Sequence, residues 1–434
     1  MIATKAGRLA VHGGPKAVTK APGDLFTWPI VTSEDEEAVL EVLRRGAMSG
    51  SDVTLKFEAE MAAFHGVPYA LGYCNGTASI LGGLWACGVG TGDEVIAPSL
   101  TYWASVMPAF SLGATVVFAD VDATSLCIDP RDIEHRITPR TKVIVAVHVY
   151  GHPCDMDAIL AVARRHGIKV LEDVSHAQGG LYKGRMLGTL GDVGCMSLMS
   201  GKSFPIGEAG MLVTKDQYLW ERATAFGFYE RTGAARFGTV DVKMTDPGLK
   251  RFAGIPLGGC KHRMNQTCSA MGRVQLAHYP ARIAEIQKAM DLFWGYLDGV
   301  PGIRPHRADA SQGSTMGGRY CPVGHYLPED LGGLSLETFV RALAAEGVPC
   351  GGAPNAPLHL HPFFHEADVY NHGKPTVIAN AARDVRQGPG SLPVTEAAPG
   401  RVLQVPWFKH AREEYIREYA DAVRKVIGDA DALR

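Results

Sequence analysis

Residues 171–215 combine acids, a lysine and several glycines in an order that suits catalysis. An apolar run ends in Glu172 and Asp173, and an isolated lysine, Lys202, stands between a Ser- and Gly-rich approach and the turn Gly207–Gly210. Another apolar run follows this turn. We therefore expect an acid at the C-terminal end of one strand and a lysine on a tight loop beside another. This edge of an α/β sheet is where ligands bind.

These residue types indicate one kind of chemistry. A lysine whose surroundings lower its pKa can form a Schiff base with a carbonyl group. An Asp at the end of a buried strand can keep a heteroaromatic nitrogen protonated, which a pyridoxal 5'-phosphate (PLP) site requires. Lys202 and Asp173 therefore make a PLP-dependent enzyme a candidate.

The tetrapeptide Asn75-Gly76-Thr77-Ala78 lies between a predicted strand at Tyr69–Tyr73 and an apolar helix that runs through Trp85. A strand that leads through small residues into a helix N-terminus offers unpaired N–H groups and a favourable dipole to an anion such as phosphate. The alternative is an N-cap turn without a ligand, and the tetrapeptide alone leaves both open.

An aromatic residue, Tyr102, follows the predicted strand Asp93–Pro98. A ring at this place can stack on a flat cofactor, or it can simply pack against its neighbours. A histidine-rich loop invites a metal hypothesis; its members are His359, His361, His365 and His372. Pro357 and Pro362 interrupt any helical spacing, and no Cys supports the cluster, so we expect no metal here. We expect these histidines to be polar loop residues at the mouth of the pocket instead.

Alternating strand and helix signals predict an α/β fold with a mostly parallel sheet and helices on both faces. Strands are expected at 69–73, 93–98, 115–121, 142–148, 167–171, 211–214 and 317–321. Helices are expected at 33–45 with Ser33 as N-cap, 53–65, 156–165, 219–225, 267–276, 281–297, 335–346 and 411–427. We predict an N-terminal arm at 1–32, a large domain at 33–280 and a small C-terminal α+β domain at 281–434.

The amino-acid composition limits the kinds of partner that this chain can bind. Among 434 residues, 43 Lys and Arg nearly balance 45 Asp and Glu, which argues against a nucleic-acid or membrane-surface partner held by bulk charge. The nine cysteines form no CxxC pair, which favours a reduced, cytoplasmic compartment. No segment approaches the ~18 apolar residues of a membrane span, and no signal peptide is evident.

The order of these motifs is more specific than any one of them. Asn-Gly-Thr-Ala, Pro-Ser-Leu-Thr-Tyr, His-Val-Tyr-Gly, Glu-Asp, Ser-x4-Lys-x4-Gly-Glu-x-Gly and Arg-Met follow one another along the chain. This order resembles the DegT/DnrJ/EryC1/StrS family of PLP-dependent sugar aminotransferases, which have the fold of fold-type I PLP enzymes. The resemblance covers residues 25–280 well and the remainder loosely.

The resemblance implies roles for individual residues. Lys202 matches the Schiff-base lysine, Asp173 the acid that pairs with the pyridine nitrogen, and Tyr102 the ring that stacks on the cofactor. The phosphate cup corresponds to Gly76, Thr77, Ala78 and Ser197. Lys261 stands where the family has an Asn or Lys that reaches the phosphate of the neighbouring subunit, which implies a homodimer with shared active sites.

Two departures stand out. The family often has Gln three residues after the Asp and His two residues further on, whereas this chain has His176 and Gln178. His176 can still donate to the phenolic oxygen of the cofactor, so it remains a candidate site residue. The family's Gly-Glu-Gly-Gly has Ala209 at its third position, where a positive φ would strain the backbone.

The implied activity is a transamination with ping-pong kinetics, in which L-glutamine or L-glutamate gives its amino group to a cyclic keto acceptor. The arm sequence Leu9–Pro15 resembles that of scyllo-inosose aminotransferases, which favours a keto-cyclitol; a keto-sugar stays open. Alternatives are a sugar dehydratase of the same fold, which typically has His in place of Lys202, and a non-catalytic PLP-fold regulator. A nicotinamide enzyme fits less well because the first strand–helix turn lacks GxGxxG.

Overall fold

The computed structural model describes residues 8–233, 242 and 244–434, so residues 1–7 of the predicted arm lie outside the described chain. Its centre is a seven-stranded sheet in the order β1-β9-β8-β5-β4-β2-β3. The strands are β1 (Tyr69–Tyr73), β2 (Glu94–Pro98), β3 (Thr115–Ala119), β4 (Thr141–Val147), β5 (Lys169–Asp173), β8 (Val193–Ser197) and β9 (Gly210–Thr214). Only β9 runs against its neighbours in this sheet, so the predicted mostly parallel α/β fold is confirmed.

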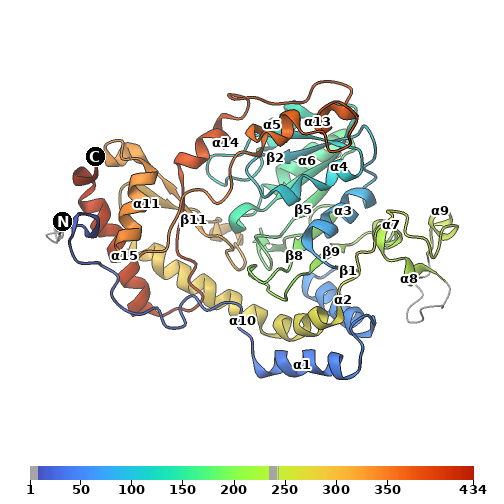
Figure 1. The fold of residues 1–434 in the computed structure, drawn as a ribbon, viewed down its shortest axis with the longest axis horizontal. Helices are drawn as coiled ribbons and strands as arrows, with labels where there is room; N and C mark the ends of the chain where they lie inside the picture. Colours follow the sequence, from blue (N-terminus) through green and yellow to red (C-terminus); the bar gives the residue numbers. More distant parts are fainter. Residues whose placement is uncertain (1–7, 234–241, 243) are drawn as a thin grey trace.

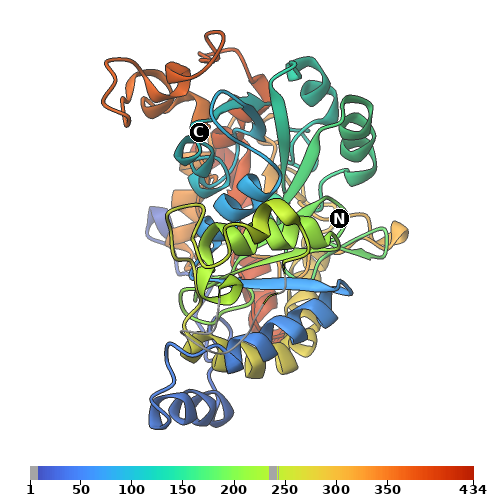
Figure 2. The ribbon, with the colours of Figure 1, turned by 90° about the vertical axis from the view of Figure 1, so that its right-hand side faces the viewer.

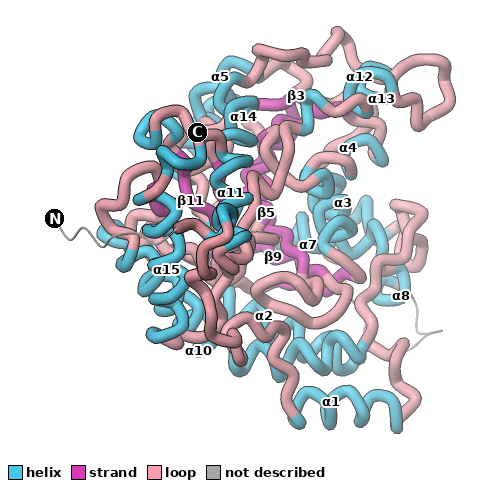
Figure 3. Tube along the Cα trace, turned by 60° about the vertical axis from the view of Figure 1, so that its left-hand side comes forward, coloured by secondary structure: helices cyan, strands magenta, loops and turns pink. Residues whose placement is uncertain are grey.

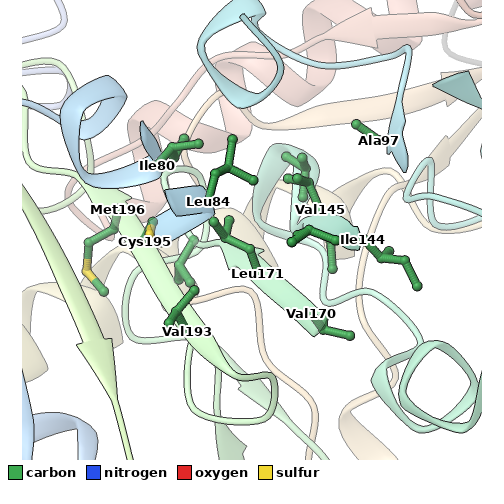
Figure 4. Packing of buried hydrophobic residues seen from close by; sticks show 14 of the residues in the cluster. Ile80, Leu84, Ala97, Ile144, Val145, Val170, Leu171, Val193, Cys195 and Met196 are labelled. Atoms are coloured by element: carbon green, nitrogen blue, oxygen red, sulfur yellow. The ribbon is translucent and has the colours of Figure 1, made fainter. Parts of the chain in front are cut away.

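The sheet forms because its strands carry apolar side chains on both faces, as parallel strands covered by helices require. Helix α3 (Gly76–Ala86) packs across one face, and its Ile80 and Leu84 lie over Val145 and Leu171 of the sheet (Figure 4). These four side chains are almost completely buried. The packing fixes the N-terminus of α3 beside the C-terminal ends of the central strands.

Helices surround the sheet (Figures 1, 2 and 3). Helix α7 (Gln217–Gly227) packs beside α3, whereas α2 (Asp52–His65) packs on β1 and is itself covered by α10 (Gln266–Tyr296), with α1 (Ser33–Arg44) outermost. The other α-helices and strands described before α10 are α4 (Pro108–Ser111), α5 (Pro130–Arg136), α6 (Met156–His166), β6 (Leu181–Tyr182), β7 (Arg185–Met186), α8 (Tyr229–Thr232) and α9 (Pro247–Lys250).

The prediction of separate helices at 267–276 and 281–297 is wrong, because α10 is one helix of 31 residues with Pro280 inside it. A proline in a helix interior removes one hydrogen bond and typically costs about 3 kcal/mol. Packing on both sides compensates for this cost. Tyr279 belongs to the core of the large sheet, and Ile286 and Phe293 belong to a second core.

The second core lies at the far end of α10 (Figure 1). A small antiparallel sheet and two helices build it: β10 (Ile303–Pro305), β11 (Val323–Tyr326), β12 (Val402–Gln404), α11 (Leu336–Ala345) and α15 (Glu413–Gly428). Leu9 and Leu25 of the arm are buried in the same core. The strand predicted at 317–321 is wrong, since Gly317, Arg319 and Cys321 all have positive φ, and the strand begins at Val323 instead.

Residues 358–398 return from the second core to the exposed edge of the large sheet. Gln387 donates to the Phe118 carbonyl and accepts from its N–H, and Thr115 donates to the Val377 carbonyl. This stretch carries only short helices: α12 (Phe363–Glu366), α13 (Thr376–Ala379) and α14 (Pro393–Ala397). It therefore covers edge strand β3, which would otherwise present unpaired backbone groups.

Two local predictions need correction. Thr32, not Ser33, caps α1: its hydroxyl accepts from the Asp35 N–H, and the Asp35 carboxylate accepts from the Thr32 N–H. Strand β8 is missing from the prediction, because its Gly and Ser residues hide the apolar pattern. None of the described helices is long and apolar enough to cross a membrane.

Candidate active site

A cavity of about 440 Å³ opens where β4, β5 and β8 end. The side chains at these strand ends, Val147, Asp173 and Ser197, line it together with the first turn of α3. All the predicted site residues except Ala78 and Lys261 contribute to this lining. A larger hollow of about 610 Å³ between α1, α2 and α10 is lined mainly by charged and apolar helix-surface residues.

Lys202 lies on the loop that joins β8 to β9. This loop closes through the Leu198 N–H to the Ala209 carbonyl at 2.8 Å, and the Lys202 N–H donates to the Met199 carbonyl at 2.8 Å. Within the loop the positive φ, 103°, belongs to Gly207 and not to Ala209. Ala209, which stands where the family has Gly, therefore lacks the backbone strain that a positive φ would cause.

The pKa of the Lys202 amine is lowered for a physical reason. Its side chain is buried, and this burial lowers the pKa to about 8 although the nearby Asp173 carboxylate opposes the shift. At pH 7 about a tenth of the amine is then neutral, roughly 300-fold more than for an ordinary lysine. A neutral amine is the nucleophile that Schiff-base formation needs.

Asp173 points into the cavity with its carboxylate held in place. Ser105 Oγ donates to Oδ2 at 2.7 Å, and the Ser175 N–H donates to Oδ1 at 3.0 Å. The neighbouring Glu172 points to the opposite face of β5, where it bonds to His148 Nε2 at 3.0 Å and accepts from the Gly188, Leu190 and Gly191 N–H groups. Strand alternation thus gives the two adjacent acids different roles.

His176 also lines the cavity. Burial, and then the positive charge of Lys202, keeps the pKa of His176 well below its usual value, so the ring is neutral at pH 7. Its Nδ1 accepts from the Tyr150 N–H at 3.3 Å, which places the proton on Nε2 as a donor. Gln178 does not line the cavity, and its side-chain amide donates to the Ser197 carbonyl at 2.7 Å.

The first turn of α3 leaves two backbone N–H groups unpaired within the part of the chain that the structure describes. The side-chain oxygen of Asn75 accepts a hydrogen bond from the Ala78 N–H at 2.8 Å, and the Asn75 carbonyl accepts one from the Ser79 N–H. In the described chain, no residue accepts from the N–H groups of Gly76 and Thr77. A Cβ on Gly76 would lie 2.6 Å from Ser197 Cβ, so only glycine lets β8 approach this turn.

Tyr102 and Lys261 differ in their position relative to the cavity. Tyr102 and Trp103 stand at the rim with about half of their surface exposed, their ring centroids 4.9 Å apart. Lys261 lies away from the cavity, with its amine 6.0 Å from the centre of the Tyr229 ring.

The four histidines of the C-terminal loop were expected at the pocket mouth, but they are not part of the lining. His359 is buried and bonds to Ser99 Oγ at 2.8 Å and to Glu396 at 3.1 Å. No group of three or more His, Cys, Asp or Glu in the described chain is placed to hold a metal ion.

Sequence reasoning missed several cavity residues, chiefly Ser105, Tyr320 and Asn355. The Tyr320 ring lies 4.0 Å from Lys202 Nζ. Ser105 could have been found from its place shortly after a strand end. Tyr320 and Asn355 come from beyond residue 300, and no motif in the sequence marks them.

Comparison with known proteins gives consistent matches. The model of the DegT/DnrJ/EryC1/StrS aminotransferase family matches residues 29–424. The spore coat polysaccharide biosynthesis protein SpsC of Bacillus subtilis is 31% identical over 418 residues, which cover 94% of this chain and 97% of that protein. The L-glutamine:2-deoxy-scyllo-inosose aminotransferase of Streptomyces kanamyceticus is 33% identical over 445 residues, covering 98% and 97%.

A solved structure agrees with these sequence matches. The aminotransferase from Psychrobacter cryohalolentis superposes with a TM-score of 0.79 at 27% identity, covering 94% of this chain and 100% of that chain. Because it covers 94% of this chain, the match extends over both cores.

Proposed function

Because the chain belongs to the DegT/DnrJ/EryC1/StrS aminotransferase family, we propose that it transfers an amino group from L-glutamine or L-glutamate to a keto-cyclitol or keto-sugar. The fold is fold-type I, and enzymes of this family depend on PLP. The single observation that carries the proposal is the buried Lys202 amine in the same cavity as the Asp173 carboxylate.

The residues present fit PLP. The lining of the cavity of about 440 Å³ includes both the first turn of α3, with its N–H groups unpaired among the described residues, and the buried Asp173 carboxylate. The contact between Gly76 and Ser197, which leaves no room for a Cβ, would let a phosphate group approach the backbone of this turn. When bound, PLP would supply an electron sink for the carbanion formed at the substrate carbon.

Each side chain then has a task. Lys202 would hold PLP as a Schiff base and, once released, would move a proton at the substrate carbon as general base and acid. Asp173, fixed by Ser105 and Ser175, would keep the pyridine nitrogen protonated. The Nε2–H of His176 would donate to the phenolic oxygen of the cofactor.

The phosphate would be held by the first turn of α3. We assign the donors to the N–H groups of Gly76 and Thr77, the Thr77 hydroxyl and the Ser197 hydroxyl, while Ala78 closes the turn. Tyr102, at the cavity rim, would stack on the ring. Lys261 would reach the phosphate of a partner subunit, so the enzyme would be a homodimer with shared sites, and we place it in the cytoplasm.

The acceptor proposal is supported by the relatives. The Streptomyces kanamyceticus enzyme, which matches nearly the whole chain, is named for glutamine as donor and an inosose as acceptor. SpsC is named for polysaccharide biosynthesis, which suits a sugar acceptor. Both acceptors are polyhydroxylated cyclic ketones, and we favour the keto-cyclitol because the coverage of that relative includes the arm.

An absorption experiment tests the proposal. The purified protein with PLP should show a visible band that L-glutamine or L-glutamate abolishes and that scyllo-inosose or a keto-sugar restores. Borohydride reduction before the donor is added should attach PLP to the peptide that contains Lys202. Peptide mapping must separate it from Lys409, a second buried lysine whose pKa burial lowers to about 6. Attachment elsewhere, or its persistence in Lys202→Ala, would refute the site assignment.

A further inference from the structure

We propose that Trp28, Tyr320 and Trp407 form an aromatic bracket that positions Lys202 and gives its amine a resting place when the amine is not covalently engaged. These residues come from three segments far apart in the sequence: the N-terminal arm, the stretch before β11 and the stretch after β12. The catalytic part of the inference rests on the proposed role of Lys202.

Two members of the bracket contact Lys202 directly. The Trp28 indole N–H donates to the Lys202 carbonyl at 2.8 Å, which holds the backbone of the loop. The Tyr320 ring centre lies 4.0 Å from Lys202 Nζ, a distance at which a ring face attracts a cation. Backbone and amine of one lysine are thus held by aromatic residues that do not belong to its own sheet.

Trp407 ties the two contacts together. Its ring lies 5.9 Å from the Trp28 ring and 5.5 Å from the Tyr320 ring, to which it is nearly perpendicular at 89°. Its indole N–H donates to the Gly318 carbonyl at 3.0 Å, two residues before Tyr320. Trp407 therefore fixes both the Tyr320 ring and the backbone that carries it.

The backbone around Tyr320 is strained in a way that serves this contact. Arg319 has a φ of 49° and Cys321 a φ of 51°, both in a region that non-glycine residues seldom adopt. Arg319 is anchored by its guanidinium group, which donates to Asp291 at 2.5 Å. Strained residues that persist next to a catalytic group are typical of functional positions.

The bracket has a measurable consequence for the amine. A ring face stabilises the charged form of Lys202, so removal of the ring while the site stays buried should lower the pKa of the amine. Opening the site to water would act in the opposite direction and raise the pKa toward its ordinary value. The sign of the change therefore distinguishes contact with the ring face from simple exclusion of water.

The test uses the full-length protein after removal of PLP with hydroxylamine. Trace acylation with acetic anhydride across a pH series, read by mass spectrometry, gives the pKa of Lys202 without any catalytic readout. Tyr320→Met, which keeps an apolar side chain of similar reach, should lower this pKa by about one unit. Tyr320→Phe, which keeps the ring, should retain it. A pKa in Tyr320→Met at or above that of the wild type would overturn the proposal.

The backbone contact is tested with PLP restored. Trp28→Phe, which keeps a ring but removes the indole N–H, should slow the half-reaction with L-glutamine in kcat by about threefold to tenfold with little change in KM. Trp220→Phe is the matched control, because its indole donates to the Ala70 carbonyl at 3.3 Å, away from the cavity. Equal rates for both variants would also overturn the proposal. A wild type that does not react with amino donors would refute the proposed function, while the acylation result would still decide the contact with the ring.

Discussion

Loss of the hydrogen bond between Ser105 and Asp173 should lower the catalytic rate considerably. Ser105 Oγ donates to Asp173 Oδ2 at 2.7 Å, and the Ser105 and Asp173 side chains are both almost fully buried. Only the Ser175 N–H, at 3.0 Å, also donates to this carboxylate within the described chain. Ser105→Ala therefore removes one of two fixed donors to a buried charge and lets the carboxylate turn away from the pyridine nitrogen.

The size of the effect follows from the kind of bond. A hydrogen bond to a charged group contributes about 1.5–3 kcal/mol. Each 1.4 kcal/mol of lost transition-state stabilisation corresponds to about a tenfold change in rate. We therefore expect the half-reaction of Ser105→Ala with L-glutamine, followed by stopped-flow absorption of the cofactor, to be about 10- to 100-fold slower than that of the wild type.

A matched variant separates this effect from a general loss of packing. Ser99 is also buried, and its hydroxyl bonds to His359 Nδ1 at 2.8 Å, but it does not line the cavity. Ser99→Ala should lower the thermal unfolding midpoint about as much as Ser105→Ala while leaving the half-reaction within about twofold of the wild type. If both variants react at the wild-type rate, Ser105 does not hold the catalytic carboxylate and the reasoning is refuted.

Three further predictions concern the binding of PLP and the sharing of sites between subunits. Attachment of PLP to the cofactor-free protein should accelerate as pH rises through about 8 and level off above it, because burial lowers the pKa of Lys202 to about 8 and only the neutral amine attacks; a rise centred near 10.5 in stopped-flow absorption would contradict this. Gly76→Ala should weaken PLP binding at least tenfold in equilibrium titration, since its Cβ would lie 2.6 Å from Ser197 Cβ, and unchanged affinity would remove this turn from the phosphate site. If Lys261 serves a partner subunit, mixing inactive Lys202→Ala with an inactive Lys261→Ala variant should restore part of the transaminase activity, and mixtures without activity would count against shared sites.

The parts of the site that follow one another along the sequence could be predicted from it. Asp173 lies at the end of an apolar strand, and Gly76 lies where another strand meets a helix, so their places follow from the α/β pattern alone. Lys202 could be singled out because it is isolated in a Gly- and Ser-rich stretch. For these residues the structure brings together what the sequence places at neighbouring strand ends.

Other features could not be predicted because distant packing decides them. Pro280 ordinarily ends or kinks a helix, yet α10 continues through it since two separate cores hold its halves. Tyr320 lines the cavity between Arg319 and Cys321, which both adopt a positive φ that no local sequence signal demands of these residue types. The position of the N-cap of α1 is a smaller example. Ser33 and Thr32 both carry a suitable hydroxyl, and the sequence alone does not distinguish them.

The reactivity of Lys202 is itself a product of tertiary structure. Burial lowers the pKa of its amine, against the opposing charge of Asp173. The arm contacts the backbone of this lysine through Trp28, and the segment before β11 places the Tyr320 ring beside its amine. Neither contributor belongs to the motif that identifies the lysine. It follows that substitution of Tyr320, which lies outside that motif, should change the pH profile of the enzyme, whereas substitutions of equal size on the outer face of α1 should not.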